Sequence, residues 1–386
     1  MGSGVVRSNL LRVLLAIVLV VGCGADGRLL SNSPAQHPTV PPALPTDIPT
    51  SDPQPVAFPR DEAAHDRLTE WWYYTGHLWS VPAGQAPGPR IKYGFEFVVF
   101  RAERGDFPVS WASHLALTDE NGNDFAYAQR SEIGPQVDVS SGGGFDLRIH
   151  GSDDRGVIDL EAPVWEMAGL DGSDGLDAAT DDFGISISMV DTRAEPVLHD
   201  TDGWIDFGEA GSSYYYSRPR MTAGGTLTVG DRSFEVDGEA WFDHQWGDFI
   251  AVGGGGWDWF AVNLDDGTDL TVSLVRAADG TYPLVYGTLV RATGETVHLP
   301  SDAFTVTPLD TWRSVRTGAT YPSGWTIEIP TEQLEITLTP TVLAQELDTR
   351  QTTGVIYWEG SQMVEASRAG ELLGGEAYVE LTGYAP

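Results

Sequence analysis

The sequence has almost no cysteine. Cys23 is the only one in 386 residues. A single thiol forms no internal disulfide and builds no zinc site from cysteine ligands. The fold must therefore be held by burial and hydrogen bonds.

Positive charge is also scarce. Lysine and arginine number 22 against 56 aspartates and glutamates, which gives a net charge of −34 and a pI near 4.3. Binding to nucleic-acid phosphates needs a basic surface, so we expect no nucleic-acid partner. The acidic surface indicates either a well-solvated exterior or adaptation to salt.

The sequence lacks an apolar run long enough for a confident transmembrane helix. The short run at residues 13–21 follows two arginines, as in a secretory signal. Residues 20–23 read VVGC and resemble the lipobox of bacterial lipoproteins. We expect residues 1–22 to be a signal peptide and Cys23 to be lipidated. The protein would then be exported and anchored at the bacterial cell membrane or outer membrane; the alternative is a plain secretory peptide.

The segment after the signal is rich in proline. Residues 31–60 contain nine prolines with serine, threonine and aspartate. This composition packs no core and favours an extended, disordered chain. We expect residues 23–58 to be a tether that holds the folded part off the membrane.

No long segment shows a helical period with caps. Instead, apolar residues recur near every second position between Gly, Asp and Asn turns, which predicts an all-β protein. The segments with this alternation are RIKYGFEFVVFRA, TLTVGDRSFEVDGEAWF, TVSLVRA and WTIEIPTEQLEITLTP.

The two halves of this region resemble each other, which indicates two copies of one unit. We expect domains at 59–248 and 249–386, joined near a glycine run. The matching pairs are 95–102 with 270–277, 71–78 with 257–264, and 238–242 with 375–379.

Two tandem antiparallel barrels, closed or nearly so, satisfy this pattern. Closure removes exposed strand edges. A barrel of about eight strands also leaves room for one small ligand.

Several motifs of catalysis and cofactor binding are missing. The sequence has no H-x-H or H-E-x-x-H spacing, no G-x-S-x-G elbow, no P-loop and no dinucleotide fingerprint. We expect no cofactor and no metal, although ligands from three separate strands could still converge on a structural ion.

The stretch GEAWFDHQWGDF (238–249) holds the strongest candidates for chemistry. Side chains alternate along a strand, so Asp243 should lie on one face, and His244 and Trp246 on the other. A histidine between aromatic rings has a lowered pKa and can exchange protons near neutral pH, and a tryptophan ring can stabilise a carbocation. The alternative is a core histidine bonded to backbone.

TEWWYYTGHL (69–78) places Glu70, Trp72 and Tyr74 on one face. A carboxylate among aromatic rings is costly unless paired, and once desolvated it can act as a general acid. The alternative is a glutamate at the barrel mouth, paired with Arg101 or Arg218.

Other residues could line the same pocket. Glu96 shares a face with Val98 and Phe100 and points either inward or, as the more common outcome, to solvent. The remaining candidates are His114, Tyr216, Arg218 and Trp257.

Five segments together resemble the AttH-like family, which includes the carotenoid 1,2-hydratases. The resemblance extends from Pro59 to Tyr384 and implies two tandem lipocalin-like β domains. The segments are EWWYYTGHL, YGFEFVVFR, HLALTD, WFDHQWG and the closing YWEG…GEAYVELTGY.

The resemblance also implies a chemistry. In these hydratases a carboxylic acid protonates an isolated C=C bond of a polyene, aromatic rings shield the carbocation, and water quenches it without a cofactor. The family's active-site His and Trp map onto His244 and Trp246. Its catalytic aspartate lies on the next strand, which here reads TVSLVRA (271–277) and has no carboxylate. A substitute acid would be Asp243, Glu70 or Glu96.

We therefore expect an exported lipoprotein that binds a hydrophobic isoprenoid or fatty ligand and acts as a cofactor-free hydratase-type enzyme. Asp243 or Glu70 would donate the proton, His244 would tune it or position water, and aromatic residues of the same strands would shield the cation. The alternatives are a non-catalytic lipocalin-like carrier and a structural surface protein. An enzyme predicts a carboxyl group beside His244 in reach of the pocket; a carrier predicts an apolar cavity without one.

Overall fold

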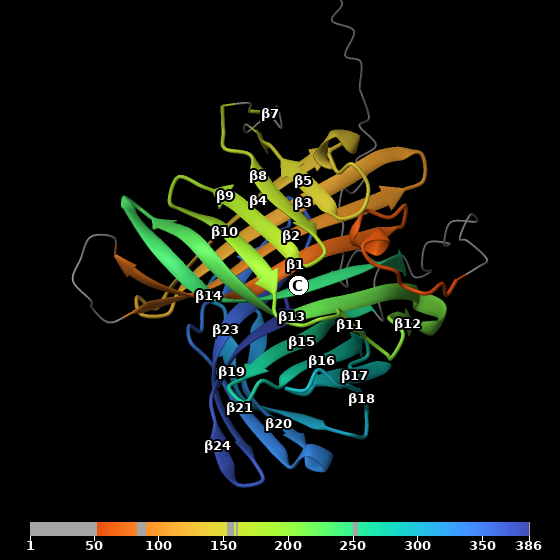
Figure 1. The fold of residues 1–386 in the computed structure, drawn as a ribbon, viewed down its shortest axis with the longest axis vertical. Coiled ribbons are helices and arrows are strands. Elements are labelled where there is room, and N and C mark those ends of the chain that lie inside the picture. Colours follow the sequence, from red (N-terminus) through yellow and green to blue (C-terminus); the bar gives the residue numbers. More distant parts are fainter. Residues whose placement is uncertain (1–51, 83–89, 153–157, 160, 250–253, 386) are drawn as a thin grey trace, which may run out of the picture.

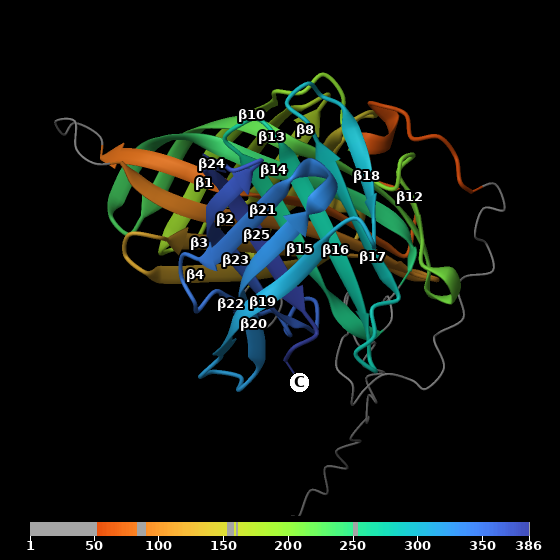
Figure 2. The same ribbon diagram turned by 90° about the horizontal axis from the view of Figure 1, so that it is seen from below.

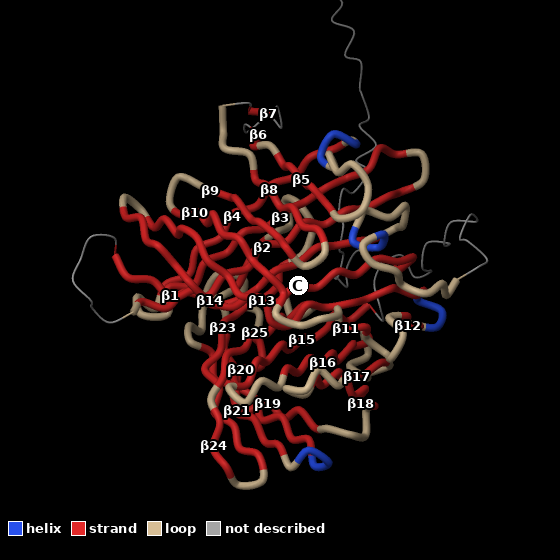
Figure 3. The backbone as a smooth tube through the Cα atoms, viewed as in Figure 1, coloured by secondary structure: helices blue, strands red, loops and turns tan. Residues whose placement is uncertain are grey.

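The computed structural model describes residues 52–82, 90–152, 158–159, 161–249 and 254–385. Strands dominate these ranges (Figure 3), and the predicted all-β class is confirmed. No helix within them is long and apolar enough to cross a membrane. The expected signal peptide and Cys23 lie outside the described residues. The short helices are η1 (Arg60–Glu62), η2 (Pro135–Val137), η3 (Gly208–Ala210) and η4 (Pro330–Glu332).

The first sheet curls into a nearly closed barrel in the upper half of Figure 1. Its antiparallel path is β4-β3-β2-β1-β14-β13-β10-β9-β8-β5, and the end strands β4 and β5 contact each other. Strands β11 and β12 pair with β13, and β6 pairs with β7. The bounds are β1 (Thr69–Pro82), β2 (Ile91–Arg104), β3 (Phe107–Asp119), β4 (Asp124–Ile133), β5 (Phe145–Ile149), β6 (Gly151–Ser152), β7 (Ile158–Asp159), β8 (Trp165–Leu170), β9 (Ser173–Ala179), β10 (Phe183–Asp191), β11 (Val197–Leu198), β12 (Trp204–Asp206), β13 (Gly211–Val229) and β14 (Arg232–Phe249).

The second sheet forms a half-barrel, seen in the foreground of Figure 2. Its antiparallel path is β18-β17-β16-β15-β25-β23-β21-β20-β19, with β22 and β24 paired to β23. Tandem antiparallel barrels are therefore confirmed. The bounds are β15 (Gly254–Leu264), β16 (Asp269–Ala277), β17 (Leu284–Val290), β18 (Thr296–Pro300), β19 (Thr305–Arg313), β20 (Thr320–Ile329), β21 (Leu334–Pro340), β22 (Glu346–Asp348), β23 (Ile356–Arg368), β24 (Glu371–Leu373) and β25 (Gly375–Thr382).

The strand register reproduces the predicted internal repeat. Trp71 lies opposite Phe100 in the first sheet, and the matching residues Trp257 and Val275 lie opposite each other in the second. The closing strands agree in the same way, because β14 returns beside β1 and β25 returns beside β15. The repeat is confirmed as two copies of one strand arrangement.

Each sheet encloses its own apolar core because alternate side chains point to its concave face. The first core is rich in aromatic residues such as Trp72, Phe97 and Trp165. The second includes Phe260 and Trp325.

The outer faces of the two sheets pack against each other. This contact forms a third apolar cluster, which joins β1, β2 and β14 to β15 and β25. The two barrels therefore form one packed unit. The buried residues of this cluster are Tyr73, Val98, Trp241, Trp259, Ala261 and Tyr378.

Residues 52–58, expected to belong to the disordered tether, pack against the first barrel. Val56 and Phe58 contact its core, and the Phe58 ring lies 4.8 Å from that of Tyr216. The expectation that residues 52–58 are disordered is therefore wrong. Burial of these two apolar side chains holds the proline-rich segment against the barrel.

Candidate functional site

Strands β1 and β14 divide the candidate residues between two faces. Trp72 pairs with His244, and Tyr73 pairs with Asp243. The first pair faces the core of the first barrel, and the second pair lines a cavity between the barrels. The predicted alternation is confirmed, and it produces two separate polar sites.

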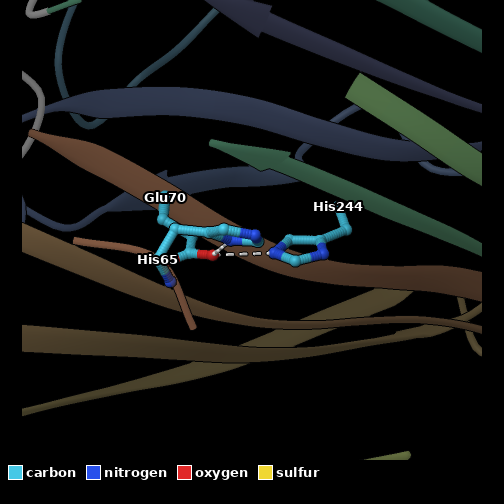
Figure 4. Close-up of side chains that lie close together, drawn as sticks. All are labelled: His65, Glu70 and His244. Atoms are coloured by element: carbon cyan, nitrogen blue, oxygen red, sulfur yellow. Dashed lines mark hydrogen bonds and ion pairs between the residues drawn. The ribbon is translucent and has the colours of Figure 1, made fainter. Parts of the chain in front are cut away.

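The inner site joins three residues at the mouth of the first barrel. The His65 Nδ1 and His244 Nε2 atoms lie 2.7 Å and 2.9 Å from the same oxygen of Glu70. Figure 4 shows both imidazole rings directed at this carboxylate. His65 also stacks on Trp246, with ring centroids 4.2 Å apart, and Trp72 stacks on His244 at 4.7 Å.

The inner site stabilises an ionised Glu70. Burial alone would raise its pKa, but the adjacent histidines hold it at about 2. Burial would lower the pKa of His65, yet Glu70 and Asp61 raise it above its ordinary value. Burial lowers the pKa of His244 to about 4, so this ring is neutral at neutral pH.

The same three side chains could hold a metal ion. Within the described ranges, their ligand atoms lie within 4.8 Å of one another. Two imidazoles and a carboxylate are a suitable set for zinc. However, Glu70 already accepts hydrogen bonds from both rings, and Arg101 lies 3.9 Å from it. The cluster is therefore satisfied by hydrogen bonds and charge without an ion.

Arg218 does not pair with Glu70. It forms ion pairs with Glu62 at 2.5 Å and Asp191 at 2.8 Å inside the first barrel. The main partners of Glu70 are histidines, and Arg101 is only a distant one.

The aromatic residues expected to line a ligand pocket beside His244 fill the first core instead. Trp72, Tyr74, Tyr216 and Trp246 are all buried there. The Tyr74 hydroxyl donates a hydrogen bond to Asp174 at 2.7 Å. These rings therefore support the inner site.

A cavity of about 90 Å³ lies between the outer faces of the two barrels. Its wall is mostly aromatic, and it receives three carboxyl groups. Strand β16, which carries TVSLVRA, contributes Ser273 and Val275 but no acid. The lining residues are Trp71, Tyr73, Glu96, Val98, Phe100, Phe207, Tyr215, Asp243, Gln245, Phe249, Trp257, Trp259, Ser273, Val275, Tyr286, Tyr357 and Glu380.

Glu96 is a neutral acid on this cavity. Burial raises its pKa to about 8. The hydrogen bond with Tyr357 acts in the opposite direction, but its effect is smaller. Its Oε1 atom lies 2.7 Å from the Tyr357 hydroxyl, whereas the buried Oε2 atom has no hydrogen-bond partner among the described residues.

Asp243 faces the same cavity in a different environment. It accepts hydrogen bonds from the Tyr215 hydroxyl at 2.5 Å, the Trp241 indole at 2.6 Å and the Ser217 hydroxyl. Burial raises its pKa to about 6. The three hydrogen-bond donors favour the ionised form and therefore limit this rise. At neutral pH Asp243 is mostly ionised.

The second barrel supplies Glu380, the third carboxyl group of the cavity wall, and Glu359, which is not part of the wall. Glu359 accepts a hydrogen bond from Tyr73 at 2.8 Å, and burial raises its pKa well above the ordinary range. Glu380 accepts one from the Trp257 indole at 2.9 Å, and burial raises its pKa to about 7.

The geometry corrects two expectations. The expected role of His244 in tuning Asp243 is wrong, because the two residues lie on opposite faces of β14, as the alternation predicted. The expectation that Glu96 points to solvent is also wrong, because only 1% of this residue is exposed. Alternation assigns faces correctly but cannot tell that a second barrel covers the outer face of the first.

Sequence reasoning missed His65, Tyr215, Tyr357 and Glu380. His114, which it named, lies behind Tyr357 instead of on the cavity wall. The internal repeat held a usable signal, because extending its closing-strand alignment places Glu380 at the position of Asp243. No comparable signal marked His65.

We predict that Glu70→Gln destabilises the fold by about 3–5 kcal/mol, the scale for removing one partner of a buried ion pair. Protonated His65 contributes its full stabilisation below its unfolded pKa near 6.5. This contribution is lost as pH rises through the higher pKa of His65 in the folded protein. The stability from Glu70 is complete above its unfolded pKa of 4.5 and is lost as pH falls through about 2. The difference from wild type should therefore be largest between about pH 4.5 and 6.5.

Denaturant unfolding across pH measures this effect. Glu328→Gln, at an exposed position on β20, is the control and should change stability by less than about 0.5 kcal/mol. Equal stability losses for both variants at pH 5.5 would contradict the assignment.

Comparison with known proteins agrees with this architecture. The profile of the AttH-like family matches residues 49–384. The chain is similar to a solved structure assigned as AttH from Nitrosomonas europaea, with 29% identity and a TM-score of 0.72 over 88% of this chain and 100% of that one. A comparison with curated protein sequences gave no match.

Two further solved structures share the fold. Kievitone hydratase from Nectria haematococca has 18% identity and a TM-score of 0.62, over 87% of this chain and 95% of that one. CghA has 13% identity and a TM-score of 0.52, over 82% and 89%. Because the family profile spans both barrels, the chain belongs to the AttH-like family.

Proposed function

We propose that the cavity between the barrels adds water across a C=C bond of a hydrophobic isoprenoid or fatty molecule, without a cofactor. One observation carries this proposal: two carboxyl groups on one aromatic cavity have pKa values on either side of neutral, about 8 for Glu96 and about 6 for Asp243. Carboxyl groups separated in this way take the roles of acid and base.

Glu96 is the general acid in this proposal. It transfers its proton to one alkene carbon, and the π electrons form the new C–H bond. A carbocation remains on the other carbon, and Glu96 becomes a carboxylate. The Tyr357 hydroxyl at 2.7 Å stabilises that carboxylate by donating a hydrogen bond to it.

Asp243 is the general base. Water forms a C–O bond to the carbocation, and one of its protons passes to Asp243. Three donors hold the Asp243 carboxylate ionised and oriented before the reaction. Such prior orientation reduces the reorganisation needed in the transition state.

The aromatic wall suits a cationic intermediate. Trp71, Tyr73, Trp257 and Trp259 line the cavity, and the faces of such rings attract positive charge. The same rings exclude bulk water, which limits premature quenching.

The cavity size indicates which part of a substrate enters. Its volume of about 90 Å³ is smaller than the roughly 150 Å³ cavity that accepts benzene in an engineered protein core. It therefore accepts the unsaturated end of a longer molecule. The half-buried residues Trp71, Phe100, Phe207 and Trp257 mark the side from which the chain enters.

A lipocalin-like carrier is the alternative. An apolar cavity supports it, but a carrier gains nothing from buried carboxyl groups, which cost stability. Membership of a family with a hydratase among its structural neighbours also favours an enzyme. We further propose that the protein is an exported lipoprotein anchored through Cys23.

We predict that Glu96→Gln lowers turnover by about 10²–10⁴-fold, the usual contribution of a positioned acid. The assay incubates purified protein with isoprenoid alkenes and unsaturated fatty acids in heavy-oxygen water and detects labelled alcohols by mass spectrometry. Glu235→Gln, exposed on β14, is the control and should retain activity. If the wild type retains a ligand but forms no labelled alcohol, the result supports the carrier instead.

We predict a bell-shaped pH dependence of kcat/KM with its maximum between about pH 6 and 8. Activity should fall below pH 6 as Asp243 is protonated, and above pH 8 as Glu96 loses its proton. Asp243→Asn should lower the whole curve and remove the acidic limb. An acidic limb that persists in this variant would assign the base to another residue.

We predict that Cys23→Ser moves the protein from the membrane fraction to the soluble fraction of its native host, because it removes the site of the lipid anchor. Cell fractionation with immunoblotting measures the change, and mass spectrometry of the wild type should detect a lipid on Cys23. Thr39→Ser, in the segment after Cys23, serves as the control. Unchanged membrane retention of the Cys23 variant would contradict lipid anchoring.

A further inference from the structure

We infer that His199 is a positioning residue for the base Asp243, and that the second barrel fixes the direction in which its ring donates a hydrogen bond. His199 follows β11 and is fully buried. It is not part of the cavity wall and acts on Asp243 through other side chains. The inference rests on the proposed function, which uses Asp243 as the base, but the hydrogen bonds themselves can be tested without turnover.

His199 supports two of the three donors to Asp243. Its Nε2 atom lies 2.7 Å from the hydroxyl of Ser217, which donates to Asp243. Its ring packs on the ring of Tyr215, with centroids 4.0 Å apart, and its backbone N–H donates to the Tyr215 carbonyl at 3.2 Å. The Tyr215 hydroxyl is the second donor to Asp243. One buried imidazole therefore holds both donor residues in place.

The ionised Asp243 determines the direction of the hydrogen bonds behind it. A carboxylate only accepts, so Ser217 uses its single hydroxyl proton toward Asp243. The Ser217 oxygen then accepts from His199, whose proton must lie on Nε2. Burial lowers the pKa of His199 to about 3, so the ring is neutral and its Nδ1 atom is bare. Nδ1 accepts from the hydroxyl of Thr288 on β17, 2.9 Å away.

The second barrel orients Tyr215 in the same way. The Trp259 indole donates to the Tyr215 hydroxyl oxygen at 3.0 Å. An indole N–H cannot accept, so the hydroxyl proton of Tyr215 is directed to Asp243 instead. Trp259 lies on β15 and Thr288 on β17, whereas Asp243 lies on β14 of the first barrel. The outer donor of each path thus comes from the second barrel.

The turn after His199 holds its backbone in a strained conformation. Asp200 and Thr201 have φ values of 48° and 73°, in the left-handed region that a β-branched residue rarely adopts. The Gly203 N–H closes the turn by donating to the His199 carbonyl at 2.7 Å. Such strain persists only where the surrounding structure imposes it, and it is concentrated at functional sites. The turn therefore supports a role that needs a fixed position of the His199 ring.

Water does not replace these contacts. Ser217 and His199 are fully buried, and Thr288 is only 2% exposed. In a buried chain each hydrogen bond polarises the next one. Without the His199 N–H, the Ser217 hydroxyl loses the contact that orients and polarises it, and it donates more weakly to Asp243.

Histidine ¹⁵N NMR of the purified protein without substrate tests the direction at neutral pH. The His199 signals are assigned as those lost in His199→Gln. We expect a neutral ring with its proton on Nε2, and a shift of the Nδ1 resonance in Thr288→Val, which removes the donor to that atom.

Thr271→Val is the matched control for this shift. Thr271 lies opposite Thr288 on the neighbouring strand β16, is equally buried, and its hydroxyl has no hydrogen-bond partner among the described residues. This variant should leave the Nδ1 resonance unchanged. A proton on Nδ1 of the wild type, or equal shifts in Thr288→Val and Thr271→Val, would overturn the inference.

Turnover tests the consequence for Asp243. We expect His199→Leu to lower kcat about 10-fold with little change in KM, the scale for losing one hydrogen bond that serves a charged group. His199→Gln should restore kcat, because its amide can place an N–H where Nε2–H lies. Wild-type kcat in His199→Leu, or an equal loss in His199→Gln, would contradict the positioning role.

Thr288→Val covers the case in which His199→Leu does not fold. It is nearly isosteric and should lower kcat about 5-fold, the scale for one neutral hydrogen bond. Thr288→Ser keeps the hydroxyl and should match wild type. Equal kcat values in Thr288→Val and wild type would reject the contribution of the second barrel.

Infrared spectroscopy without substrate separates this inference from the proposed function. The Asp243 carboxylate band is the one lost in Asp243→Asn, and it should shift in His199→Leu but not in His199→Gln. These shifts without any hydration activity would retain the positioning of Asp243 and reject the hydratase. Hydration activity with an unchanged band and unchanged kcat in His199→Leu would retain the hydratase and reject the role of His199.

Discussion

The packing of the two barrels, outer face to outer face, is the constraint on which the rest of the structure depends. It removes Glu96, Asp243 and Glu359 from water, and no cationic side chain of the described residues pairs with any of them. Buried carboxyl groups without countercharges must bind a proton or receive several hydrogen bonds. Glu96 takes the first course and Asp243 the second, and this difference creates an acid and a base on one cavity.

The internal repeat explains why the cavity lies where it does. The repeat places Asp243 and Glu380 at equivalent positions of the two closing strands, so the contact between the sheets brings a carboxyl group from each half to one space. The inner site of His65, Glu70 and His244 occupies the opposite face of the same strands. It holds the segment before β1 against the first barrel, while the outer face of these strands lines the cavity between the barrels.

The sequence predicted the architecture well because local patterns determine it. Alternation and turn residues predicted the all-β class, and the matched segments predicted two similar β units. The site was predicted only in part. Asp243, Glu96 and Trp257 line the cavity, but Trp72, Tyr74, Tyr216 and Trp246 fill a core. A strand pattern gives the face of each side chain, and it does not show which face the other barrel covers.

The central claim is that Glu96 is protonated and Asp243 ionised at neutral pH. Neutron diffraction from a deuterated crystal grown near pH 7 tests it most directly, because it locates the hydrogen atoms. Our account predicts a deuterium on Glu96 and none on Asp243. A bare Glu96 carboxylate would contradict its role as the acid.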